Sequence, residues 1–441
     1  MKTTNIILLS FFFLTNIYSQ PTMKVVLTIN AIGYHKGDTV EVKAHLPASE
    51  NFPEQFLLTN GNRQRWLKSD VVKRVELIND FWDSYWFYYR SGEIQKKGWD
   101  SDLRSELKTN CKDFIQDATD NKLIFDDDLL VDYLYQLVHK ICSGKLYKGY
   151  NTNFSVVVFK ANEANSFAFD NGTIVLTTKL LSQTKSEKDL VKILAKQVAN
   201  IVLDHQLLNL KQQISAGRSA AFWTGLVGVA STVAAASNES KGSDDFTMDD
   251  AENLTRAAYI FSSSIGEQMG VKLSNVQDKN ANNISELYVS KYYDGWNKQT
   301  NDEYLRDISN VLTYTAWQNY YQKNFNEALQ LVTRLENAHV ASNEDFLLKA
   351  KIYRMLYTTD EANYEAIRCL EIAKSLGNVQ LVEIFKEEGL LYLRINNLDK
   401  AASAFSEYRK GLEEMQKSGS DCTEELRWVS NLMQKYQFNY N

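Results

Sequence analysis

The chain has 441 residues, 44% hydrophobic and 24% charged, which supports sizeable buried cores and two to three globular domains rather than a disordered chain. Its formal net charge is −6 at pH 7 and it has no basic stripe, which argues against a nucleic-acid partner. It contains only three Pro, as suits a largely helical protein.

The first 19 residues have the pattern of a secretory signal. Lys2 precedes the apolar run IILLSFFFLTNIY, and the small residue Ser19 stands before Gln20. The run is too short for a spanning helix and predicts cleavage near Ser19 or Gln20. No Cys follows it, so we expect no lipoprotein anchor. The mature chain is therefore predicted to be exported, in the periplasm or the cell envelope.

Residues 20 to 80 are predicted to form a small β-rich, SH3-like module. Val25, Leu27 and Ile29 alternate with other residues, GYHKGD follows as a turn, and a second alternation begins at Val40. The next aromatic run, FWDSYWFYY at 81–89, is expected to pack as a linker or strand against the following domain.

Helical periodicity is evident from 102 to 141. We expect Asp126, Asp127 and Asp128 to cap a helix start rather than to form an acid–base pair, because adjacent side chains diverge around a helix. The apolar face of that helix comprises Leu130, Leu134, Leu137, Val138 and Ile141.

The stretch from Phe154 to His205 carries the most informative pattern. A strand with a Gly-containing turn is followed by the segment TTKLL at 177–181, and then by a helix reading DLVKILAKQVANIVLDH. The strand and turn residues are Asn165, Ser166, Phe167, Ala168 and Gly172.

This pattern resembles the HtpX/BepA/Oma-like zinc metallopeptidases, metallopeptidase family forty-eight, in which NAFA and a Gly turn precede a helix ELAxVLAHExxHxxxxH. The resemblance implies an α+β, gluzincin-type domain over about 81 to 300, whose edge strand pairs with substrate. It places Lys196, Gln197 and Asn200 where the family has His, Glu and His, and retains the last His as His205. The third family ligand, a Glu on a later helix, falls near Glu267 in a weaker alignment.

These replacements remove the chemistry of the zinc motif. Two His at i and i+4 can hold one Zn²⁺, with the intervening Glu as general base. Lys196 is a cation without a lone pair when protonated, and Asn200 offers only a neutral amide oxygen. Gln197 cannot take a proton from water. The sequence therefore predicts a pseudopeptidase with no cofactor.

Residues 219–237, SAAFWTGLVGVASTVAAAS, carry no charge. Their Gly, Ser, Thr and Ala content makes them weakly hydrophobic, so a buried or interface-seeking hairpin is favoured over a membrane span. Peripheral membrane contact through this segment stays open.

Residues 308–441 contain helical repeats resembling tetratricopeptide units. The small residues Ala316 and Ala350 are 34 positions apart, the repeat length of that family. Such hairpins stack into a surface that binds peptides or proteins. The further repeat positions are Ala328, Val332, Tyr353, Ala366, Leu370, Ala373, Gly389, Tyr392, Ala401 and Phe405, with a capping helix over 424–436.

The four cysteines, Cys111, Cys142, Cys369 and Cys422, show no CxxC spacing. Pairing of the first two and of the last two, or four buried free thiols, all agree with the sequence.

The sequence as a whole predicts a mostly helical α+β protein that is exported and binds polypeptides through the dead cleft and the helical repeats. One alternative is an active metalloendopeptidase with a non-standard zinc site built from His205 and Glu267. Another is a fold that only presents the repeats to an envelope complex.

Overall fold

The computed structural model describes residues 23–48, 52–74, 81–92, 99–142, 153–215, 271, 273–377 and 382–438. The predicted signal, the apolar segment 219–237 and Glu267 lie outside these ranges. Within the ranges, no helix is both long and apolar enough to cross a membrane. The chain divides into two compact units, residues 1–101 with 144–152, and residues 102–143 with 153–441.

The first unit contains an antiparallel five-stranded sheet, which confirms a small β module at the N-terminal end. Alternate residues of β1 and β2 point into its core, including Val25 and Val42. The turn between these strands has Gly33 and Gly37 at positive φ, which glycine adopts without steric cost. The strands, in the spatial order β4-β3-β2-β1-β5, are β1 (Met23–Leu27), β2 (Thr39–Leu46), β3 (Gln55–Asn60), β4 (Arg63–Lys68) and β5 (Val72–Arg74), with a 3₁₀ turn η1 (Ser69–Val71).

The aromatic run forms a helix, α1 (Phe81–Arg90), so the expectation of a linker or strand was wrong. Trp82 and Trp86 are i and i+4 and both are buried, which places them on one face of the helix. His45 on β2 contacts this helix, because its ring stacks on Tyr88. On its other side, its Nε2 lies 2.8 Å from the Glu54 carboxylate.

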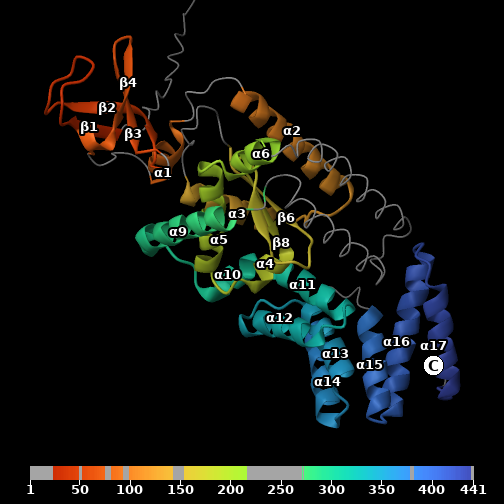
Figure 1. Ribbon diagram of the computed structural model, residues 1–441. Helices are drawn as coiled ribbons and strands as arrows, with labels where there is room; N and C mark the ends of the chain where they lie inside the picture. The colour runs from red at the N-terminus through yellow and green to blue at the C-terminus, as the bar shows by residue number, and fades with distance from the viewer. Residues whose placement is uncertain are drawn as a thin grey trace, which may run out of the picture. The chain divides into compact units, whose positions relative to one another are not determined.

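The second unit begins with two helices and a small mixed sheet, in the spatial order β6-β8-β7, with β6 parallel and β7 antiparallel to β8. In Figure 1 this sheet and the helices α4 to α6 lie together in the yellow to yellow-green part of the chain. The elements are α2 (Trp99–Asp120), α3 (Asp128–Ile141), β6 (Ser155–Phe159), β7 (Ser166–Ala168), β8 (Thr173–Thr177), α4 (Thr178–Gln183), α5 (Glu187–Val202), α6 (His205–Ser215), α9 (Asn275–Tyr292) and η2 (Tyr293–Gly295).

Local sequence explains where two of these helices start. Asp127 is the N-cap of α3 and its side chain accepts the N–H of Leu130 at 3.1 Å, which confirms the capping prediction. All five predicted apolar residues of α3 are buried. At the start of α5, Ser186 caps the helix, and the buried Glu187 accepts a hydrogen bond from the hydroxyl of Tyr293 at 3.2 Å.

The C-terminal region is helical throughout its described part, and its helices pair antiparallel in chain order, from teal to blue in Figure 1. Small residues sit where the pairs meet, since Ala316, Ala350 and Ala401 are all fully buried. The predicted final helix is present as α17. The helices are α10 (Asn301–Asp307), α11 (Ser309–Tyr321), α12 (Phe325–Asn337), α13 (Asn343–Leu356), α14 (Asp360–Ser375), α15 (Val382–Arg394), α16 (Leu398–Lys417) and α17 (Thr423–Lys435).

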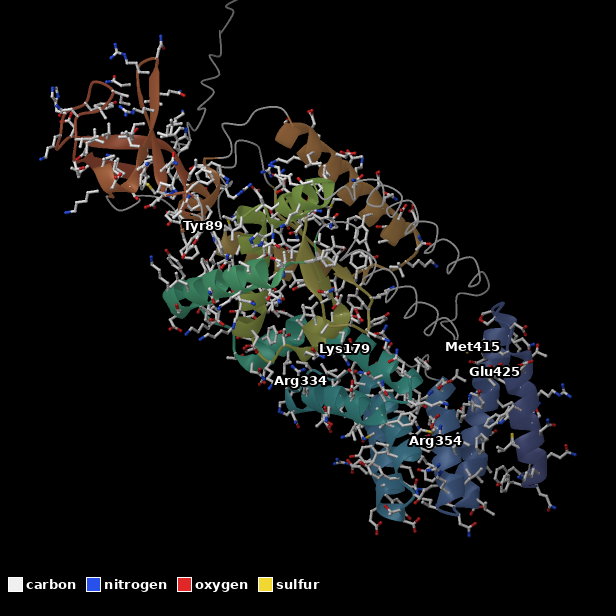
Figure 2. The ribbon with its side chains drawn as sticks, in the orientation of Figure 1. Tyr89, Lys179, Arg334, Arg354, Met415 and Glu425 are labelled. Carbon is white, nitrogen blue, oxygen red and sulfur yellow. The ribbon has the colours of Figure 1, made fainter. Side chains whose placement is uncertain are left out.

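The first helical pair, α11 and α12, contacts α4 through two basic side chains, Arg334 and Lys179, which are labelled in Figure 2. The Arg334 guanidinium on α12 donates to the carbonyl oxygens of Ser182 at 2.6 Å and Thr184 at 2.8 Å, at the C-terminal end of α4. On α4 itself, Lys179 pairs with Glu327 at 2.7 Å. Because the carbonyls at a helix C-terminus lack intrahelical partners, Arg334 supplies a cap from another element.

All four cysteines are free and buried, so the structure favours the free-thiol alternative. Burial raises the pKa of the Cys111 and Cys369 thiols to about 11 in each case. The reactive thiolate is therefore scarce at pH 8. We expect native protein to react with Ellman's reagent at fewer than one thiol per chain, and guanidinium-unfolded protein at four. Two or fewer reactive thiols after unfolding without a reductant would instead indicate disulfides.

Candidate functional site

A pocket of about 690 Å³ lies between the edge strand β7, the middle and C-terminal part of α5 and the first half of α9. It brings together three segments. The strand residues from Asn165 on and the KQVAN positions were both predicted as site residues from the sequence, whereas the third segment, a helix some 80 residues later, was not. The residues that line it are Glu163, Ala164, Asn165, Ser166, Phe167, Leu180, Lys192, Ile193, Lys196, Gln197, Asn200, Val271, Leu273, Asn275, Asp278 and Asn282.

Strand β7 offers backbone groups at the side of this pocket. On the β8 side, the Asn165 carbonyl accepts from the Thr177 backbone N–H at 3.1 Å, and the Phe169 N–H donates to the Thr173 carbonyl at 2.8 Å. Since alternate residues of an antiparallel strand bond to the same neighbour, Ser166 and Ala168 direct their N–H and C=O groups away from β8. Within the described ranges β7 is an edge strand. Gly172, at φ +102°, forms the turn that returns the chain into β8.

Two of the three motif positions are joined in a directed chain of hydrogen bonds. The amide of Gln197 donates to Ser166 Oγ at 2.8 Å, and the amide of Asn200 donates to Gln197 Oε1 at 2.8 Å. Asn200 Oδ1 then lies 3.0 Å from His205 Nδ1, so the imidazole donates from that nitrogen. We name the four residues Ser166, Gln197, Asn200 and His205 the amide ladder. It connects the edge strand β7 to α5, and α5 to the start of α6.

His205 does not lie on the same helix as the motif. α5 ends at Val202, and Asp204 has a positive φ of 55°, so the chain turns before His205 begins α6. The sequence analysis placed His205 on the same helix as the motif positions. The structure corrects this, because the chain turns between them, and the turn brings His205 into contact with Asn200. His205 is buried and is not part of the pocket lining.

The third motif position, Lys196, forms an ion pair across the pocket. Its Nζ lies 2.6 Å from Asp278 Oδ1 on α9, and Asn282 donates to the other oxygen of that carboxylate at 2.9 Å. One turn earlier on α5, Lys192 pairs with Glu286 at 2.8 Å. Two ion pairs therefore join α5 to α9 along one side of the pocket.

A buried charge cluster lies at the far end of β7. Arg104 on α2 bonds to Asp170 at 2.6 Å and to Asp204 at 2.8 Å, and both carboxylates are almost fully buried. In addition, the backbone N–H of Asp170 donates to the Gln206 side chain at 2.7 Å. The cluster fixes both the turn after β7 and the turn between α5 and α6. Sequence reasoning missed it, because the three charged residues are 66 and 34 positions apart and no local motif connects them.

The donors at the motif positions do not fit zinc. An ammonium group that is held by a carboxylate and two amides that bond to each other provide neither the anionic nor the imidazole ligands that zinc requires. In the described part of the chain, no three His, Cys, Asp or Glu side chains are grouped as a metal site would need. Glu267, the other residue considered as a ligand, is outside that part.

Comparison with known families agrees with the strand and helix pattern. Residues 132–295 match the family model described as Peptidase family M48, a range that contains the sheet β6-β8-β7, α5 and α9. The match supports the resemblance drawn from the NSFA and KQVAN segments. No curated protein matches the chain significantly.

Proposed function

We propose that this chain is a catalytically inactive, exported pseudopeptidase that uses its metallopeptidase-type domain to hold polypeptide. The match of residues 132–295 to Peptidase family M48 gives the domain, and the residues at the site argue against hydrolysis.

One observation carries the proposal. The three positions that would hold the metal and the base are taken by Lys196, Gln197 and Asn200, and each is engaged with another protein group. Without a general base on the motif helix, a bound water would have no acceptor for its proton there. Peptide hydrolysis at this site therefore lacks both the metal ligands and the general base.

Peptide binding needs neither a metal ion nor a general base. An extended peptide can add to an open strand edge through main-chain hydrogen bonds, while pockets beside the strand select alternate side chains. The backbone groups of Ser166 and Ala168 on β7 point away from β8, and Ser166 lines the 690 Å³ pocket, where its carbonyl accepts a long hydrogen bond from Gln197 at 3.4 Å.

The C-terminal helices add a second binding surface in this proposal, as a tetratricopeptide-like array. The 34-residue step from Ala316 to Ala350 and the burial of both residues in successive helical pairs support that reading. The signal-like residues 1–19 support export to the cell envelope.

The decisive experiment is zinc stoichiometry on the purified chain from residue 20 to 441, by elemental mass spectrometry, together with casein hydrolysis in the presence and absence of a chelator. We expect less than about 0.1 zinc per chain and no cleavage, because the ligand set is lost. An active zinc endopeptidase serves as the positive control in both assays.

The opposite result is equally clear. About one zinc per chain with chelator-sensitive cleavage would establish a metalloendopeptidase with a non-standard site. The variants His205→Ala and Glu267→Ala would then identify its ligands.

A further inference from the structure

We propose that the pocket selects uncharged polypeptide segments, and that the ion pair between Lys196 and Asp278 sets this selectivity. The inference rests on the proposed function, since it names the class of polypeptide that the same site takes.

Among the described residues of the lining, positive and negative groups are equal in number. They are two ammonium groups, Lys192 and Lys196, and two carboxylates, Glu163 and Asp278. Lys196 and Asp278 pair with each other at 2.6 Å, and Lys192 pairs with Glu286 beyond the lining. A zinc-bearing site would present a divalent cation here, whereas this pocket presents a cation whose charge is already matched.

The remaining polar groups among these described residues are neutral. They are amides and one hydroxyl, groups that can both donate and accept hydrogen bonds, and three of them, Ser166, Gln197 and Asn200, already bond to one another in the amide ladder. Around them are apolar side chains, so the surface offers neutral hydrogen bonding and hydrophobic contact together. The neutral polar residues are Asn165, Ser166, Gln197, Asn200, Asn275 and Asn282, and the large apolar ones are Phe167, Leu180, Ile193, Val271 and Leu273.

A charged ligand side chain would bind less well for a physical reason. It would lose hydration on entry, and at Lys196 and Asp278 it could gain an ionic partner only by separating that pair, which would leave one of these two groups without its counterion. A valine side chain incurs neither loss, and a threonine, serine or asparagine side chain loses less hydration than a charged one and needs no counterion. The site therefore favours neutral, extended segments.

The test uses three fluorescein-labelled heptapeptides with blocked ends, in which valine alternates with threonine, with lysine or with glutamate. Alternating valine favours the extended conformation, and replacing every threonine prevents a shift of register from hiding the charge. With the full mature chain, fluorescence anisotropy is expected to show the threonine peptide binding at least about fivefold more tightly than either charged peptide, a factor equivalent to one unit-charge interaction at 4 Å in water.

Charge-neutralising variants make the test specific. Asp278→Asn leaves the Lys196 ammonium unmatched, so we expect the ratio of glutamate-peptide to lysine-peptide affinity to rise about fivefold, and Lys196→Gln should shift it about fivefold the other way. Lys298→Gln is the matched control, because it breaks an exposed pair with Asp294 away from the pocket and should leave the ratio unchanged.

The outcomes separate two failures. If none of the three peptides binds, the proposed function fails and the inference with it. If a charged peptide binds wild-type protein as tightly as the threonine peptide, or if the two variants do not shift the ratio in opposite directions, polypeptide binding stands and the selectivity inference is overturned.

Discussion

Arg104→Met is expected to destabilise the second unit by about 3–5 kcal/mol, the range typical of breaking a buried ion pair by removal of one partner. The substitution keeps much of the side-chain volume, so the loss comes from the two ion pairs that Arg104 makes with the buried carboxylates of Asp170 and Asp204. Guanidinium unfolding followed by far-UV circular dichroism would measure the change in the free energy of unfolding.

The same substitution at an exposed site provides the control. Arg368 pairs with Glu365 on the surface of α14, and its side chain is 61% exposed. Arg368→Met should therefore leave the free energy of unfolding almost unchanged, because solvent screens an exposed pair. Equal effects of the two substitutions would show that the buried cluster does not fix the turns at β7 and α6. Peptide binding should weaken only in the Arg104 variant, since β7 ends at that cluster.

Gly389→Val is expected to destabilise the C-terminal helices by about 3 kcal/mol, through overpacking. A Cβ atom at Gly389 would lie 2.6 Å from the ring of Phe405, which is fully buried on the neighbouring helix α16. Replacing a helical Gly also stabilises a helix through propensity, by about 1 kcal/mol for Gly to Ala. The destabilisation from the steric clash must exceed this gain. Thermal unfolding monitored by circular dichroism would give the shift in Tm.

Two further variants isolate the steric cause. Gly295→Ala adds a Cβ that meets no atom within 4 Å, and it should stay within about 0.5 kcal/mol of wild type. Combining Gly389→Val with Phe405→Leu should recover part of the lost stability, because the smaller side chain makes room. Additive losses in the double variant would contradict direct contact between the two positions.

Sequence alone predicted the elements whose signals are local. The apolar spacing of α3, the Asp127 cap and the strand–turn–helix order around the KQVAN segment all depend on residues within a few turns of one another, and all are present. The aromatic helix α1 was mistaken for a linker or strand because aromatic residues favour strands by propensity, and its i, i+4 tryptophans were outweighed.

The arrangement of the site was harder to predict from the sequence. The turn at Asp204 depends on a single residue with positive φ, and nothing in DLVKILAKQVANIVLDH marks the end of the helix at Val202. The partner of Lys196 is Asp278, 82 positions later on a helix that the sequence had not assigned to the pocket. Pairings of this kind depend on how the chain folds back on itself, which a single sequence does not encode in any short pattern.

The bonds that Arg334 makes to α4 have a practical consequence for dividing this protein into parts. The family match ends at residue 295, and an obvious truncation would stop shortly after it. Such a fragment would leave the Ser182 and Thr184 carbonyls without their donor, Lys179 without Glu327, and the α4 surface that packs on α11 open to water. The smallest piece that keeps these contacts extends through α12, to about residue 338. The end of the family match and the end of the smallest piece that keeps the α4 contacts therefore differ by α10 and the helical pair α11–α12.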